Sequence, residues 1–162
     1  MAKSPAFLNL AKARILISND DGIDAPGLKV LEKIARKLSK DVWVIAPETE
    51  QSAAGHSLTL RRPLRIRKVS SQRCAIDGTP TDCVLLGVNE VMKGNSPNLV
   101  LSGINRGGNL GEDVTYSGTV AAAMEGTLLG IPSVAVSQVV TDRTKPRWAT
   151  AEHWVPKVLK QL

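Results

Sequence analysis

Short apolar runs alternate along this chain with segments whose apolar residues recur at helical spacing. The apolar runs predict strands buried on both faces, at 13–18, 42–46, 99–102 and 133–137. The helical segments lie at 26–38, 79–92, 119–129 and 146–162, where Pro156 is expected to kink or break the last helix. Proline marks the first helical position of two of them, at Pro26 and Pro80, and Gly130 closes the Ala-rich third.

The order of these elements indicates an α/β fold. Apolar strands that alternate with helices are typical of a Rossmann-like, doubly wound, mostly parallel sheet. Alternating patterns at 58–60, 64–67 and 73–76 predict a small antiparallel or edge β excursion around 58–76. A long Gly-rich loop is expected from Gly103 to Ser117. We predict an N-terminal tail over 1–12 and a single α/β domain over 13–162.

Composition narrows the class of protein. At 162 residues, with 43% hydrophobic and 22% charged residues, the chain suits one globular domain. No apolar run approaches the roughly 18 residues that span a bilayer, and the N-terminal segment lacks the features of a secretory leader, so no membrane role and a cytoplasmic location are expected. Cys74 and Cys83 lack zinc-site spacing and are expected to be reduced, inert thiols.

The net charge of +6 is concentrated in one basic stretch. Its members are Arg61, Arg62, Arg65, Arg67, Lys68 and Arg73. The stretch is either a solvated face, an attractor of phosphate-rich substrates, or a nucleic-acid surface. With one Tyr and one Phe the chain offers little stacking surface for single strands, so nucleic acid is not the expected partner.

Polar residues follow the predicted strands at their carboxyl ends, where open α/β sheets place their sites. Asp20 and Asp21 come directly after the first strand, and neighbouring carboxylates repel unless a cation lies between them. Magnesium or manganese prefers such hard oxygen ligands, and Ser52 and Asn105 can add neutral oxygens from two other loops. The alternative for Asp20–Asp21–Gly22 is an ordinary acidic turn.

The segment from Tyr116 to Thr119 opens a predicted helix. Exposed N–H groups at a helix start attract anions, and the hydroxyls of Ser117 and Thr119 could donate to a phosphate. The alternative is a simple Ser N-cap. Two roles are open for His56: it either contacts the substrate or donates a proton to it, or it is a structural loop histidine.

A metal and a helix-end phosphate site facing one crevice indicate phosphoryl hydrolysis, in which the metal assists attack by water. Whether Asp20 is instead the nucleophile stays open. The chain has no GxxxxGK[ST] motif, which disfavours a P-loop hydrolase. A receiver-type signalling domain also seats magnesium on an acidic pair, but it needs an acceptor Asp where this chain has Ser102–Gly103.

Five ordered motifs resemble the survival protein SurE family. They are Asn19–Ile23, Ala46–Pro47 with Gln51–Ser57, Gly78–Val84, Ser102–Gly107 and Asn109–Ala122. The resemblance implies a 5′/3′-nucleotidase that hydrolyses nucleoside monophosphates, with a Rossmann-like fold and one divalent metal ion, Mg²⁺ or Mn²⁺, per subunit. Members are typically longer, which implies that this chain lacks a C-terminal portion that builds homodimers or homotetramers.

The same resemblance assigns roles to individual residues. It implies metal ligands at Asp20, Asp21, Ser52 and Asn105, of which Asp20, Asp21 and Asn105 are also expected to be catalytic. Contacts to the substrate or its phosphate are implied for Asn19, Gly103, Asn109, Ser117, Gly118 and Thr119.

Overall fold

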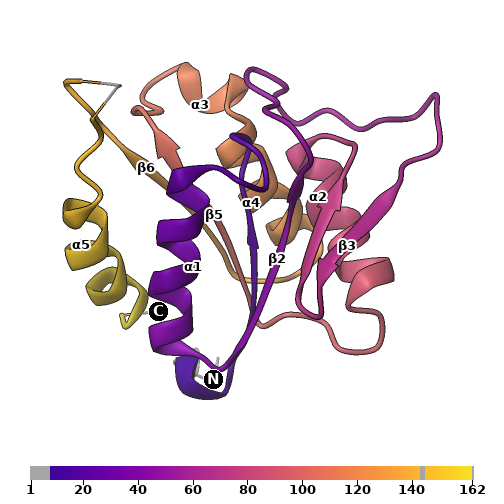
Figure 1. Cartoon of the computed structure of the whole chain (residues 1–162), viewed down its shortest axis with the longest axis horizontal. Coiled ribbons are helices and arrows are strands. Elements are labelled where there is room, and N and C mark those ends of the chain that lie inside the picture. The colour runs from indigo at the N-terminus through magenta and orange to yellow at the C-terminus, as the bar shows by residue number, and fades with distance from the viewer. Residues whose placement is uncertain (1–7, 143–144, 162) are drawn as a thin grey trace, which may run out of the picture.

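The computed structural model of the chain describes residues 8–142 and 145–161 and shows a sheet between two helical layers (Figure 1). The sheet has six strands in the order β3-β4-β2-β1-β5-β6. Every neighbouring pair is parallel except β3 with β4. The predicted doubly wound, mostly parallel sheet is therefore confirmed.

The strands are β1 (Arg14–Ser18), β2 (Asp41–Pro47), β3 (Ile66–Ser70), β4 (Arg73–Ile76), β5 (Leu99–Arg106) and β6 (Ser133–Gln138). The helices are α1 (Pro26–Leu38), α2 (Pro80–Leu86), α3 (Asp113–Tyr116), α4 (Gly118–Leu128) and α5 (Ala149–Leu159). A 3₁₀ turn, η1 (Leu10–Lys12), precedes the sheet, and a π-helical turn, η2 (Gly87–Val91), extends α2. Pro156 lies inside α5, which runs through it, so the expected break does not occur.

The apolar side chains of the central strands belong to two hydrophobic cores, one on each face of the sheet. Ile15 and Ile17 of β1 point toward α1 and α5, whereas Leu16 between them points toward the face of α2 and α4. This alternation is the period of two that a strand imposes, and it explains why the buried strands are apolar at every position. The rigid sheet fixes the positions of the loops that follow β1, β2 and β5.

The predicted antiparallel, edge β excursion is confirmed by the β3–β4 pair, but the bounds of its strands differ from the prediction. Residues 58–60 form no strand, and Leu60 is 84% exposed; Thr59 N donates instead to Asp82 Oδ1 of α2 at 3.1 Å. The second expected strand lies slightly later, as β3, and is exposed at every position. The third, β4, joins the main sheet in parallel to β2, and only the β3–β4 pair is antiparallel.

The expected loop from Gly103 to Ser117 is shorter than predicted. Strand β5 continues to Arg106, because β6 pairs with it past Gly103 through a shift in register. The short helix α3 occupies 113–116 within the same segment. Glycine content alone suggested a loop, but the pairing with β6 extends the strand by four residues beyond the predicted 99–102.

The remaining predictions concern the chain ends and the thiols. Residues 8–12 of the expected tail include η1, whose Leu10 is buried in the core, while residues 1–7 lie outside the described part of the chain. Both cysteines are free and buried, and burial raises the pKa of each thiol, as expected for inert cysteines. Among the described helices, none is long and apolar enough to cross a membrane.

Candidate active site

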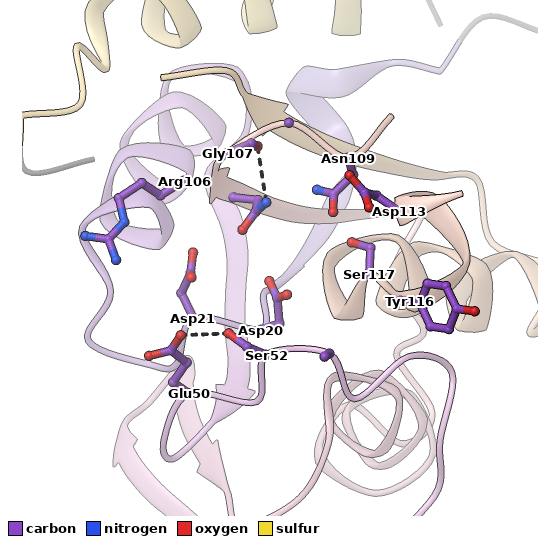
Figure 2. Close-up of a pocket in the computed structure, with 13 residues that line it drawn as sticks. Asp20, Asp21, Glu50, Ser52, Arg106, Gly107, Asn109, Asp113, Tyr116 and Ser117 are labelled. Carbon is purple, nitrogen blue, oxygen red and sulfur yellow. Dashed lines mark hydrogen bonds between the residues drawn. The ribbon is translucent and has the colours of Figure 1, made fainter. Parts of the chain in front are cut away.

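A polar cavity of about 330 Å³ opens at the carboxyl edge of the sheet. It is lined by the loops after β1, β2 and β5 together with the start of α4 (Figure 2). Six of the predicted site residues line it: Asp20, Asp21, Ser52, Asn105, Asn109 and Ser117. The carboxyl ends of the parallel strands meet at this edge, and they thus bring together residues that are far apart in the sequence.

Asp20 is seated on the N-terminus of α4. Its Oδ1 accepts a hydrogen bond of 2.5 Å from Thr119 Oγ1, and the Thr119 backbone N–H also donates to this carboxylate. A Cβ on Gly118 would lie 2.7 Å from Asp20 Cβ, so only glycine allows this approach. Burial raises the pKa of Asp20, and the bonds from Thr119 partly offset that rise.

Thr119 and Gly118 therefore support Asp20 and do not line the cavity. Thr119 is fully buried, with its hydroxyl and its N–H directed at the carboxylate. Ser117 is the residue of this helix start that reaches the cavity; its Oγ accepts from Val120 N at 3.1 Å as the N-cap, which leaves its O–H to donate elsewhere. The expected N-cap and the expected polar group at the cavity are thus the same side chain.

The pKa of Asp21 is raised well above its ordinary value. Burial, followed by repulsion from Asp20 and Glu50, raises its pKa to about 6, against a smaller opposing effect of Arg106. Glu50 was not among the predicted site residues, although it lies two positions before Ser52 in the same loop. The cavity thus concentrates negative charge, and a cation placed there would relieve the repulsion.

A distortion at the end of β5 aims Asn105 at the cavity. The register between β5 and β6 shifts between Gly103 and Asn105, and Gly103 adopts φ +131°. A Cβ at Gly103 would lie 2.3 Å from the carbonyl oxygen of Val136, so this position requires glycine. Asn105 Nδ2 donates to the Gly107 carbonyl at 3.2 Å, which engages the amide nitrogen and makes Oδ1 the atom suited to coordination.

Ser52 reaches the cavity from the loop after β2. Its Oγ donates to Glu50 Oε1 at 2.7 Å, the contact drawn as a dashed line in Figure 2. The backbone of the same loop is tied to Asp20, since Gln51 N donates to the Asp20 carbonyl at 2.8 Å. The hydroxyl oxygen of Ser52 keeps lone pairs available for a ligand while its proton is held by Glu50.

Asn19 and Gly103 lie behind the cavity wall. Asn19 is buried and donates through Nδ2 to the Gly22 carbonyl at 3.0 Å, while its Oδ1 is buried without a hydrogen-bond partner. Gly103 acts through the backbone geometry described above. Asn109 does line the cavity, and its Nδ2 donates to Ser137 Oγ at 2.6 Å, which fastens the loop after β5 to β6.

Among the polar side chains that line the cavity, sequence reasoning missed four: Glu50, Arg106, Asp113 and Tyr116. Their proximity in sequence to Ser52, Asn105 and Ser117 was the only signal that pointed to them. His56 pairs instead with the buried Glu125 of α4 at 2.8 Å and is not among the lining residues. The structure therefore favours the structural alternative for His56, in which it fastens its loop to α4.

The donor set fits a hard divalent cation. Two carboxylates, an amide oxygen and a hydroxyl oxygen face the same space, and this all-oxygen chemistry is what magnesium and manganese prefer. Within residues 8–142 and 145–161, no three His, Cys, Asp or Glu side chains lie close enough to hold a metal without other donors. A cation at this site would therefore depend on the neutral oxygens of Ser52 and Asn105.

The basic stretch is largely paired with acids of the same chain. Arg65 and Arg67 contact Glu48 at 3.2 and 2.7 Å, and these bonds lower the pKa of that carboxyl. Arg62 pairs with Asp77 at 3.1 Å, and Arg73 pairs with Glu32 at 2.7 Å. These pairs favour the solvated face over a nucleic-acid surface, because much of the positive charge is compensated locally.

Fold and site together define the class: a doubly wound α/β protein with an acidic, oxygen-lined cavity at the carboxyl edge of its sheet. The model of the family described as Survival protein SurE matches residues 15–162, and the chain belongs to this family. The match covers the sheet from the second residue of β1 onward and helices α1 to α5.

Individual relatives agree with this assignment. The chain is 71% identical over 158 residues to the 5′-nucleotidase SurE of Paramagnetospirillum magneticum, covering 98% of this chain and 61% of that protein. It is 61% identical to the 5′-nucleotidase SurE of Parvibaculum lavamentivorans, covering 92% of this chain and 54% of that protein. A crystal structure of the SurE protein from Aquifex aeolicus superimposes with a TM-score of 0.84 at 44% identity, covering 91% of this chain and 59% of that chain.

The chain thus spans between 54% and 61% of the length of these curated relatives.

Proposed function

We propose that the protein is a metal-dependent phosphomonoesterase that hydrolyses nucleoside monophosphates, at the 5′ or 3′ position, to nucleoside and phosphate. The observation that carries this proposal is the placement of Asp20, Asp21 and the hydroxyl of Ser117 around one cavity. Relatives that carry the name 5′-nucleotidase SurE support it. A receiver-type signalling role lacks such support.

The metal would be one Mg²⁺ or Mn²⁺ per subunit, held by Asp20, Asp21, Ser52 and Asn105. When bound, it would supply electrostatic stabilisation of the phosphoryl oxygens and lower the pKa of a water nucleophile. Each of these four side chains lines the cavity. Thr119 would fix the orientation of Asp20 through its two hydrogen bonds to the carboxylate.

The rest of the cavity would bind and orient the phosphate. Ser117 offers a hydroxyl donor at the positive end of α4. Arg106 brings a guanidinium to the cavity rim, and guanidinium groups suit phosphate oxygens. Asn109 is fixed by Ser137 in a position on the cavity wall. Such preorganised donors stabilise charge that develops during phosphoryl transfer.

The direct test is phosphate release from a panel of nucleoside monophosphates by the metal-stripped protein. We expect release only after Mg²⁺ or Mn²⁺ is added, and its loss when a chelator is included, because two adjacent carboxylates repel without a cation. Equal release with and without chelator would contradict metal dependence. Absence of release from every monophosphate with metal present would contradict the proposed activity.

Metal affinity should depend on pH through Asp21. Because the pKa of Asp21 is about 6 in the metal-free protein, a proton competes with the cation below that pH. We expect the affinity for Mn²⁺, measured by calorimetry, to fall by up to about ten-fold per pH unit below pH 6. A control is Asp24→Asn, which removes a nearby exposed acid that does not line the cavity. A flat affinity between pH 5 and 7 would contradict the prediction.

The same shift has a consequence for folding. The folded-state pKa of Asp21 is raised, so its contribution to stability is present at low pH and is lost as the pH rises through about 6. The contribution of Asp21 should accordingly make the metal-free protein more resistant to urea at pH 5 than at pH 7. In Asp21→Asn this pH-dependent component should be absent.

We also propose that the whole protein is cytoplasmic and forms a homodimer or homotetramer, with neither a membrane nor nucleic acid as partner. The support is the family resemblance and the local pairing of the basic stretch with acids. Light scattering during size-exclusion chromatography measures the number of subunits in the assembly. DNA titration at low salt tests whether the protein binds nucleic acid.

A further inference from the structure

A second cavity adjoins the first on the side of α1. It has a volume of about 230 Å³ and lies between the start of α1 and the segment that leads into α5. Its lining consists of Asp21, Ala25, Pro26, Gly27, Glu50, Arg106, Pro146 and Trp148. We call this cavity the Trp148 slot.

The slot and the acidic cavity are adjacent. Asp21, Glu50 and Arg106 line both, so these three residues form the boundary between the two spaces. The two cavities, at about 330 and 230 Å³, together reach the size typical of small-molecule sites. A ligand whose charged end lies beside Asp20 and Asp21 would have to pass Asp21, Glu50 and Arg106 to reach the slot.

The walls of the slot suit a flat apolar group. Pro26, Pro146 and Trp148 face it with apolar or aromatic surface, while its polar residues are the three at the boundary. Trp148 is partly buried and packs against the core under α1, so its ring is held before a ligand arrives. A Cβ on Gly27 would lie 3.2 Å from Trp148 Cη2, which shows how closely the ring approaches α1.

We propose that the Trp148 slot binds the nucleobase of the substrate, with the ring of Trp148 as its stacking surface. The inference rests on the proposed nucleotidase activity. A nucleoside monophosphate has a charged end, a polyhydroxylated sugar and a flat base, in that order. The acidic cavity, the boundary of Asp21, Glu50 and Arg106, and the aromatic slot follow one another in the same order.

The other aromatic side chain at the site is less suited to this task. Tyr116 lines the acidic cavity but is 68% exposed, on the four-residue helix α3. In Figure 2, Tyr116 and Arg106 lie on opposite sides of the two aspartates. A base that stacked on Tyr116 would leave the slot without a ligand. The partly buried ring of Trp148 is ordered in advance, and prior ordering lowers the entropic cost of stacking.

The test compares a substrate that has a base with one that has none. In Trp148→Ala, we expect KM for adenosine monophosphate to rise about ten-fold, the order of effect seen when a stacking aromatic is removed. KM for glycerol 2-phosphate should stay at the parental value, because this ester has nothing to place in the slot. Trp148→Phe should recover most of the loss. Trp154→Ala is the matched control, since Trp154 is 57% exposed on α5 and lines neither cavity.

A second measurement separates the slot from the chemistry. Adenosine alone, titrated by equilibrium dialysis, should bind the parent protein and bind Trp148→Ala about ten-fold more weakly. If the parent releases no phosphate from either ester, the proposed activity fails, and adenosine binding still decides on the slot. If both esters are hydrolysed and Trp148→Ala changes neither KM nor adenosine binding, the slot proposal is overturned while the activity stands.

Two further outcomes are decisive. A larger effect of Tyr116→Ala than of Trp148→Ala on the KM for adenosine monophosphate would place the base in the acidic cavity and overturn the proposal. If circular dichroism shows that Trp148→Ala is unfolded, Trp148→Leu keeps apolar bulk against Gly27 but removes the aromatic face, and the same two measurements apply to it. An equal KM change for both esters in that variant would also overturn the proposal.

Discussion

Replacing Asp20 with Asn should lower kcat/KM for phosphate release by about a thousand-fold, the scale at which loss of a central electrostatic group acts. The substitution removes the charge that faces the cavity but keeps the shape of the side chain. The remaining Oδ1 can still accept from Thr119, whose hydroxyl lies 2.5 Å from it. The lost rate would therefore report on charge at the cavity and not on a misplaced α4.

The stability of the variant separates these two explanations. Burial already raises the pKa of Asp20, so a neutral Asn removes an unfavourable buried charge and should not lower the melting temperature of the metal-free protein. Mn²⁺ should stabilise the parent and leave Asp20→Asn unchanged. Asp24→Asn, an exposed neighbour outside both cavities, should behave as the parent. Activity within about ten-fold of the parent would reject Asp20 as the metal seat.

The fold and the aspartate pair were accessible from sequence because both depend on short-range patterns. The apolar run that became β1 ends at Ser18, and Asp20 and Asp21 follow it directly. Parallel sheets bring strand ends to one edge, so Asn105, after β5, could be placed near them without coordinates. Pro80 at the first turn of α2, with the capping box of Thr79 and Asp82, was equally local.

What sequence reasoning could not supply were contacts between distant side chains. Thr119 suggested a phosphate donor, but tertiary packing turns its hydroxyl to Asp20, which is 99 positions away. His56 meets Glu125 across 69 positions, and no local pattern distinguishes that pairing from a catalytic role. Trp148 lines the second cavity only because α5 packs beside α1. Such contacts are decided by the fold as a whole.

The length of β5 also depends on a contact between distant parts of the chain, in this case between backbone atoms. From the sequence, Gly103 was predicted to begin a loop, since glycine is frequent in turns. In the structure it lies within β5, where the chain passes too close to Val136 for any side chain. The glycine thus serves close approach of two strands, which is a property of the pair β5–β6 and not of the segment alone.

Substituting Gly103 with Ala should consequently destabilise the fold strongly, costing about 3 kcal/mol of unfolding free energy or more. The new Cβ would lie 2.3 Å from the Val136 carbonyl oxygen, a backbone atom that can move only if β6 moves, and φ at this position is +131°. Because Asn105 follows within the same distorted segment, activity should fall with stability.

Gly94→Ala is the matched control, because Gly94 also has a positive φ, +77°, but a Cβ there would meet nothing within 4 Å. It should cost only the backbone strain, about 1 kcal/mol, and leave activity intact. Urea unfolding of both variants measures the difference, which reports the steric clash together with the added backbone strain of φ +131° over φ +77°. If Gly103→Ala proved no more costly than Gly94→Ala, β5 and β6 would have to separate freely at this point, and the rigid placement of Asn105 inferred from the structure would be wrong.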